Sequence, residues 1–135
     1  MLRCMIVDDS PCFLSAARRL LESQGVAVVA VASDSAQALR QAERLKPEVA
    51  LVDIDLGAEN GLDLARRLQC ETGPSPPWVI LVSNHAEDEY ADLIEESTVA
   101  GFIAKTGLSG DAIRALTAEE DEDHEGGSVI GTPKT

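Results

Sequence analysis

The chain has 135 residues, a length that suits one compact domain. Hydrophobic residues make up 44% of it and aromatic residues only 3%, which is typical of α/β proteins with aliphatic cores. A net charge of −13 excludes a basic surface for phosphate groups, so we expect no direct binding of nucleic acid. The sequence has no apolar stretch of membrane-span length and no signal peptide, which predicts a soluble, cytoplasmic protein without membrane contact.

Short apolar runs alternate regularly with amphipathic segments along the chain. The apolar runs are rich in aliphatic and β-branched residues and show little polar alternation, which predicts strands that are buried on both faces. The five predicted strands are Cys4 to Val7, Val26 to Ala32, Val49 to Val52, Trp78 to Val82, and Gly101 to Ala104.

Helices are predicted between and after these strands. The first has Ser10 as its N-cap and Pro11 in its first turn, and Gly25 closes it. Strands joined by right-handed helical crossovers run parallel, so the pattern predicts a (βα)5 fold with a doubly wound, five-stranded parallel sheet. The other predicted helices run from about Ser35 to Leu45, from Gly61 to Cys70, from Glu87 to Ser97, and onward from near Ser109.

The alternating pattern stops after about residue 118. Residues 119–135 begin with an acidic run, because Glu119 to Glu125 contains six carboxylates. This composition predicts a disordered tail. The expected organisation is therefore one folded domain over residues 1–118 and an acidic tail, with no room for an output domain unless a longer parent protein was truncated.

Polar side chains follow four of the predicted strands at the point where each strand ends. The first strand is followed by two carboxylates, and the third, fourth and fifth by one polar residue each. Because ligands of open α/β sheets bind at the carboxyl ends of the strands, we expect these side chains to converge. They are Asp8, Asp9, Asp53, Ser83 and Lys105.

The chemistry that needs this set is narrow. Several carboxylates without soft ligands suit a hard divalent cation, and Mg²⁺ fits best because it leaves positions for phosphoryl oxygens. Asp53 follows a central buried strand and suits the role of a nucleophile towards phosphorus, while Asp8 and Asp9 suit metal chelation. Lys105 and Ser83 would then neutralise and hydrogen-bond the phosphoryl oxygens.

These residues resemble the signature of bacterial response-regulator receiver domains, the CheY-like superfamily of two-component signalling. The resemblance covers about residues 1–118. Gly61, eight residues after Asp53, and Phe102, three residues before Lys105, also lie at the spacing of that family. The resemblance implies a flavodoxin-like strand order of 2-1-3-4-5.

The resemblance also implies roles at the acidic site. Asp53 would accept a phosphoryl group from a histidine kinase or a phosphotransfer protein. Asp9 and Asp53 would bind Mg²⁺ directly, Asp8 would bind it largely through water, and the backbone carbonyl of Asp55 would add a ligand.

The remaining implied roles concern the switch. Ser83 and Lys105 would hold the phosphoryl oxygens, and Phe102 would move inward as the switch aromatic. Phosphorylation would thereby change the surface formed by residues 87–97, residues 101–104 and the last helix, and this changed surface would regulate a downstream protein. A phosphorylation-dependent homodimer is a further option, and no enzyme activity is expected beyond the chain's own phosphorylation and dephosphorylation.

Three positions depart from the commonest pattern of the family. Thr106 replaces the usual Pro after Lys105, Asn84 replaces a small residue after Ser83, and Asp55 adds a carboxylate near the site entrance. We expect Asn84 and Asp55 to affect the rate of dephosphorylation.

Two alternative functions remain open from the sequence. The run from Asp53 to Gly57 resembles the nucleophile motif of haloacid-dehalogenase-type phosphatases, although that motif normally lies on the first strand and its fifth residue is not Gly. The other alternative is an interaction module of the receiver type that works without phosphorylation. The intact five-residue set argues against it.

Overall fold

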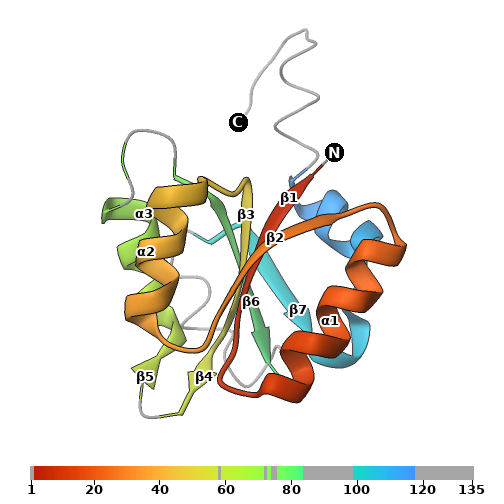
Figure 1. The fold of residues 1–135 in the computed structure, drawn as a ribbon, viewed down its shortest axis with the longest axis horizontal. Coiled ribbons are helices and arrows are strands. Elements are labelled where there is room, and N and C mark those ends of the chain that lie inside the picture. Colours follow the sequence, from red (N-terminus) through yellow and green to blue (C-terminus); the bar gives the residue numbers. More distant parts are fainter. Residues whose placement is uncertain (1, 58, 72, 74–75, 84–98, 118–135) are drawn as a thin grey trace, which may run out of the picture.

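The computed structural model describes residues 2–57, 59–71, 73, 76–83 and 99–117. Helices and strands alternate along these residues (Figure 1). In chain order they are β1 (Arg3–Val7), α1 (Pro11–Ser23), β2 (Ala27–Ala32), α2 (Ser35–Leu45), β3 (Val49–Asp53), β4 (Asp55–Leu56), β5 (Glu59–Asn60), α3 (Gly61–Glu71), β6 (Trp78–Ser83), β7 (Gly101–Ala104) and the 3-10 turn η2 (Lys105–Gly107). A further helix occupies residues 110–117.

Five strands form one parallel sheet in the order β2-β1-β3-β6-β7. Because β6 and β7 are the fourth and fifth predicted strands, this order confirms the predicted doubly wound sheet with the 2-1-3-4-5 order. The central strand β3 is buried along its whole length, whereas the edge strand β2 alternates between buried and half-buried residues. The prediction of full burial therefore holds for the centre of the sheet and not for its edges, where one side of the strand has no neighbour.

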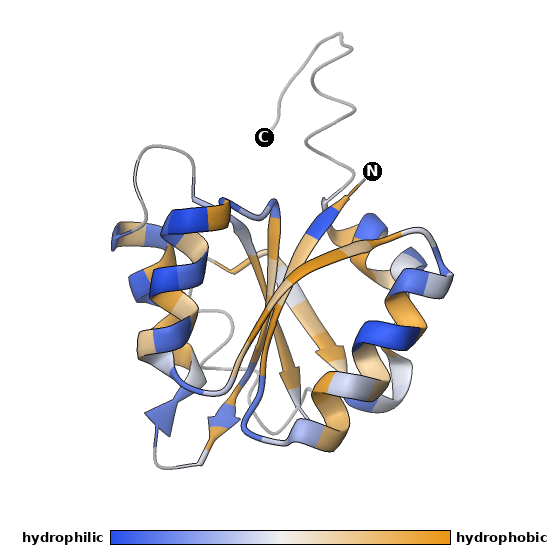
Figure 2. Ribbon diagram, in the orientation of Figure 1, coloured by the Kyte–Doolittle hydropathy of each residue, from blue (hydrophilic) through white to orange (hydrophobic). Residues whose placement is uncertain are grey.

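Helices cover both faces of the sheet (Figure 1). Successive side chains of a strand point to opposite faces, so neighbouring residues of β1 enter different cores. Met5 and Val7 pack with residues of α2 and α3, while Cys4 and Ile6 pack with residues of α1 and the 110–117 helix. Figure 2 shows the apolar stripes of the helices turned towards the sheet and the polar stripes turned away from it.

Local signals define the helix ends. The Ser10 side chain accepts a hydrogen bond from the Phe13 N–H at 3.3 Å, and Pro11 occupies the first turn of α1, as predicted. Asp34 was not predicted as a cap, but its carboxylate caps α2 by accepting from the Gln37 N–H at 2.8 Å. Gly25 follows the end of α1 with φ +85°, a left-handed conformation that glycine adopts without steric cost.

The small antiparallel hairpin of β4 and β5 was not predicted. Asp55 pairs with Asn60, and Leu56 pairs with Glu59. Two-residue strands are too short to produce a periodic pattern, so the sequence carries no signal for them. The hairpin joins β3 to α3 and lies at the carboxyl-end edge of the sheet, the lower edge in Figure 1.

The predicted helix over residues 87–97, Asn84, and the acidic tail lie outside the described residues. Among the residues that are described, no helix combines the length and the apolar character needed to cross a membrane. All three cysteines are free, and burial raises the pKa of the Cys4 thiol to about 12.

Candidate functional site

The register of the parallel strands brings the predicted site residues together. Val7 pairs with Val52, so Asp8 and Asp53, which directly follow these two, leave neighbouring strands side by side. Asp53 in turn pairs with Val82, the residue before Ser83, and Ser83 pairs with Ala104, the residue before Lys105. The expected convergence at the carboxyl ends of four strands is therefore a direct result of the sheet register.

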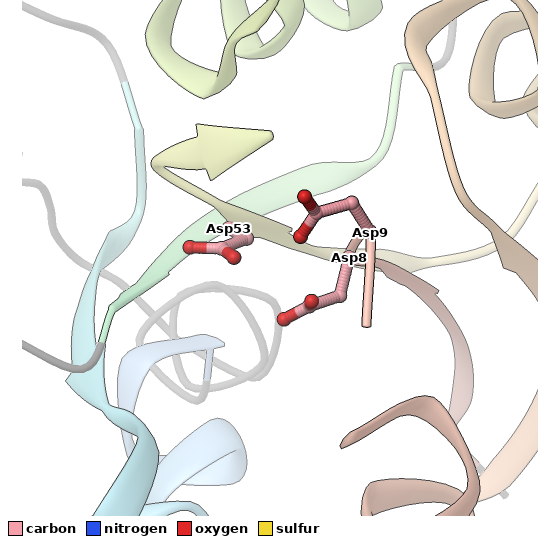
Figure 3. A group of neighbouring side chains, drawn as sticks. All are labelled: Asp8, Asp9 and Asp53. Carbon is pink, nitrogen blue, oxygen red and sulfur yellow. The ribbon is translucent and has the colours of Figure 1, made fainter. Parts of the chain in front are cut away.

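Three carboxylates form an acidic cluster at this edge, to which Asp8, Asp9 and Asp53 each contribute one ligand oxygen (Figure 3). These oxygens all lie within 4.8 Å of one another. Asp8 and Asp53 are buried, while Asp9 is exposed. Carboxylates at such distances repel one another, and hard divalent cations prefer oxygen ligands of this kind.

Lys105 supplies a positive charge inside the acidic cluster. Its ammonium nitrogen lies 2.6 Å from Asp8 Oδ2 and 3.2 Å from Asp53 Oδ2, and its side chain is only 11% exposed. It donates a hydrogen bond to Asp53, whereas its contact with Asp8 is an ion pair without hydrogen-bond geometry. Asp8 Oδ2 is thus a buried oxygen whose negative charge is balanced by the Lys105 ammonium rather than by a hydrogen bond from the described residues.

The electrostatic environment shifts two pKa values in the cluster. Burial, followed by the repulsion of Asp8, raises the pKa of Asp53 from 3.8 to about 6, against the opposing effects of the Asp55 N–H and of Lys105. Burial acts to lower the pKa of Lys105, but Asp8 and Asp53 outweigh it and raise that pKa. At neutral pH Asp53 is therefore mostly ionised and Lys105 is charged.

Backbone contacts hold the carboxylates in place. Asp53 Oδ1 accepts from the Asp55 N–H at 3.1 Å, and Asp8 Oδ1 accepts from the Ser10 N–H at 2.8 Å. Gly61 packs directly against the strand end, because a Cβ atom there would lie 2.0 Å from the carbonyl oxygen of Asp53. The glycine that lies at the family's spacing thus has a steric reason, because only glycine allows α3 to start so close to Asp53.

The β4–β5 hairpin lies over the exposed side of the acidic cluster. A Cβ atom on Gly57, in the hairpin turn, would be 3.0 Å from Asp9 Oδ2. Asp55 is exposed on β4 and contacts the cluster through its backbone N–H.

On β7, Phe102 is half-buried and packs against the core on the α2 and α3 side. The peptide bond between Lys105 and Thr106, the position where the family usually has Pro, is trans.

Two further contacts, one at Lys105 and one at the β4–β5 hairpin, were not predicted. The Phe13 ring lies over Lys105, with its centroid 4.4 Å from the ammonium nitrogen. Glu59, on β5, accepts a hydrogen bond from the Ser35 N–H at 2.8 Å and so ties the hairpin to the start of α2. Both contacts join residues far apart in sequence, so the local sequence pattern carries no signal for them.

The fold and the acidic cluster define an α/β protein of flavodoxin-like topology with a metal-type site at the strand ends. The chain belongs to the response regulator receiver domain family, whose pattern it matches over residues 4–118. The domains of this family are signalling domains rather than typical enzymes, and the haloacid-dehalogenase alternative is not supported.

Individual relatives agree with this assignment. An uncharacterized response regulatory protein of Yersinia pestis is 40% identical over 106 residues, which cover 78% of this chain and 42% of that protein. The receiver domain of the response regulator NarL from Mycobacterium tuberculosis superimposes with a TM-score of 0.73 at 28% identity, covering 86% of this chain and 96% of that domain. The BeF3-activated receiver domain of Klebsiella pneumoniae RstA superimposes with a TM-score of 0.70 at 25% identity, covering 86% and 96%.

The chain spans about half the length of the curated relatives that it matches. The family assignment therefore applies to the receiver domain and does not extend to the activity of a whole response regulator.

Proposed function

We propose that this chain is a phosphorylation-dependent signalling switch, in which Asp53 accepts a phosphoryl group from a phosphohistidine donor. The donor would be a histidine kinase or a phosphotransfer protein. The observation that carries the proposal is the position of Lys105, whose ammonium contacts Asp53 and Asp8 at once, within a cluster of three carboxylates. An ionised carboxylate beside a fixed ammonium is what a phosphoryl acceptor needs.

In the proposed transfer an oxygen of Asp53 attacks phosphorus and forms a P–O bond. The P–N bond of the phosphohistidine breaks, and its electron pair goes to the imidazole nitrogen, which takes up a proton. The pKa of Asp53, about 6, leaves its carboxylate mostly ionised at neutral pH, so the nucleophile is present without a general base. Lys105 then contacts the phosphoryl oxygens, and the Ser83 hydroxyl hydrogen-bonds one of them.

Mg²⁺ is the proposed cofactor, held by Asp8, Asp9, Asp53 and the backbone carbonyl of Asp55. The three carboxylates supply hard oxygen donors within 4.8 Å of one another, which suit this ion. When bound, the ion neutralises charge on the carboxylates and on the phosphoryl oxygens. The residues of the chain orient the acceptor: the Asp55 N–H fixes one oxygen of Asp53, and Lys105 contacts the other.

The proposed output is a change in surface that regulates a downstream protein. Ser83 and Phe102 are the proposed switch residues, and the surface spans residues 87–97, β7 and the last helix. The net charge of −13 favours a protein partner over nucleic acid for this chain. A phosphorylation-dependent homodimer and a cytoplasmic location are part of the same proposal, and so is a folded unit that ends near residue 118.

Intact-mass measurement after incubation with acetyl phosphate and Mg²⁺ tests the phosphoryl acceptor. The wild-type chain is expected to gain the mass of one phosphoryl group, and Asp53→Asn is expected to gain none. Asp63→Asn is the matched control, because Asp63 is an exposed carboxylate of α3 that pairs with Arg66 at the surface. A wild-type chain that stays unmodified would contradict the proposal and favour the phosphorylation-independent module. A phosphoryl group on Asp53→Asn would contradict the choice of acceptor.

A further inference from the structure

Phe13 and Asp8 hold the Lys105 ammonium from two sides. The ring centroid of Phe13 lies 4.4 Å from Lys105 Nζ, and Asp8 Oδ2 lies 2.6 Å from the same atom. Asp53 Oδ2 is 3.2 Å away, so the ammonium has two carboxylates and one aromatic face around it. With a side chain that is 11% exposed, Lys105 has little access to water.

One short segment positions both Phe13 and Asp8. Asp8 Oδ1 accepts from the Ser10 N–H at 2.8 Å, and the Ser10 hydroxyl accepts from the Phe13 N–H at 3.3 Å. Pro11 holds the first turn of α1 in a helical conformation. The ring and the carboxylate that contact Lys105 are therefore linked through the N-cap of α1, and they keep a fixed relation to each other.

The aromatic ring offers the ammonium more than apolar cover. The face of a phenyl ring carries partial negative charge and attracts a cation within about 6 Å of the centroid. A leucine at this position would also exclude water, but it would not attract the charge. The comparison of phenylalanine with leucine and tyrosine therefore separates attraction by the ring face from simple packing.

We propose that Phe13 is a positioning residue, which confines the Lys105 ammonium between Asp8 and Asp53 and thereby sets how fast Asp53 accepts a phosphoryl group. The effect of Phe13 on the phosphorylation rate rests on the proposed function. The effect of Phe13 on the position of Lys105 does not. A phosphoryl group on Asp53 requires only a short shift of the ammonium from Asp8 towards the new oxygens. Without the ring, the long lysine side chain samples solvent, and fewer molecules hold it in the reactive position.

Lysine labelling tests the confinement without any phosphoryl transfer. The chain has three lysines, Lys46, Lys105 and Lys134, and Lys46 is exposed and serves as the internal reference. We expect Phe13→Leu to raise the labelling rate of Lys105, relative to Lys46, by about threefold at constant pH, the effect of losing a modest cation–π contact. Phe13→Tyr keeps the ring face and should match the wild type. An unchanged ratio in Phe13→Leu would overturn the inference.

Phosphorylation rates test the consequence for the reaction. With acetyl phosphate and saturating Mg²⁺, Phe13→Leu should accept the phosphoryl group about threefold more slowly than wild type, and Phe13→Tyr should restore the rate. Leu20→Ala is the control, since Leu20 is an exposed residue farther along the same helix. Equal rates in all variants, together with increased labelling in Phe13→Leu, would overturn the effect on rate. A wild-type chain that is never phosphorylated would refute the proposed function, and labelling would still decide the role of Phe13.

Discussion

Asp53 combines burial with a negative charge, and the combination is costly at neutral pH. The residue is only 5% exposed, and Asp8 repels its carboxylate from the neighbouring strand end. Lys105 and the Asp55 N–H offset only part of this cost, so its pKa stays at about 6. The protein thus keeps a destabilising charge where a phosphoryl acceptor requires one, as functional sites often do.

Asp53→Asn should stabilise the metal-free protein at neutral pH by about 2 kcal/mol, because it removes the cost of the buried charge. A raised folded-state pKa means that the native protein binds the proton more tightly than the unfolded chain does. The wild type therefore gains stability as pH falls from about 6 towards 3.8, and the advantage of the variant should shrink over that range. Urea unfolding at several pH values in the presence of a chelator measures this difference. An advantage that does not change with pH would contradict the explanation.

Gly61→Ala should destabilise the protein by about 1–3 kcal/mol, the usual cost of overpacking, because its Cβ atom would overlap the carbonyl oxygen of Asp53. The start of α3 or the end of β3 must then shift, so phosphorylation of Asp53 should slow as well. Gly107→Ala is the control, since a Cβ atom at Gly107 meets nothing within 4 Å. Equal unfolding midpoints for the two variants would show that the close contact is not rigid.

At the scale of elements, the β4–β5 hairpin connects the acidic cluster to α2. Its first residue, Asp55, donates to Asp53, and Glu59 accepts from the Ser35 N–H at the start of α2. A carboxylate near a helix N-terminus is also stabilised by the helix dipole. The hairpin is therefore attached at both of its strands, although each strand has only two residues.

Glu59→Ala should lower the free energy of unfolding by about 1 kcal/mol, because the N–H of the buried Ser35 loses a charged acceptor. Glu43→Ala, at an exposed position within α2, should change it by less than about 0.5 kcal/mol. Chemical denaturation of both variants gives the comparison. A loss of equal size in the two variants would mean that general charge, and not this contact, is responsible.

At the scale of the whole molecule, metal binding should couple to folding. Asp8 and Asp9 follow β1, and Asp53 is the last residue of β3, so the three carboxylates form a cluster only when the sheet is assembled. Mg²⁺ at ten times its dissociation constant should stabilise the protein by about 1.4 kcal/mol, and a chelator should remove the effect. Thermal unfolding with and without Mg²⁺ measures it, with Asp9→Asn as the variant expected to respond less. Equal stabilisation of that variant would place the ion elsewhere.

Most of the sheet could be predicted because apolar runs of strand length are local properties of the sequence. Ser10 and Pro11 marked the start of α1 correctly, and the alternation of segments predicted the parallel, doubly wound sheet. The order of its strands followed only from the family resemblance. The hairpin strands were missed because two residues show no period. Full burial was wrongly expected for β2, because the sequence of a strand does not show whether that strand lies at the edge of the sheet.

By itself, the sequence determined which residue types end each strand, and so which side chains could meet: Asp8, Asp53, Ser83 and Lys105. Only the tertiary structure decided how they meet. The register sets Asp8 beside Asp53, and the packing of α1 brings Phe13 over an ammonium 92 positions later in the chain. Burial of Asp53, which raises its pKa, is likewise a property of the assembled sheet. The physical reason is that chain order specifies chemistry residue by residue, whereas distance and solvent exposure arise only when separate segments pack together.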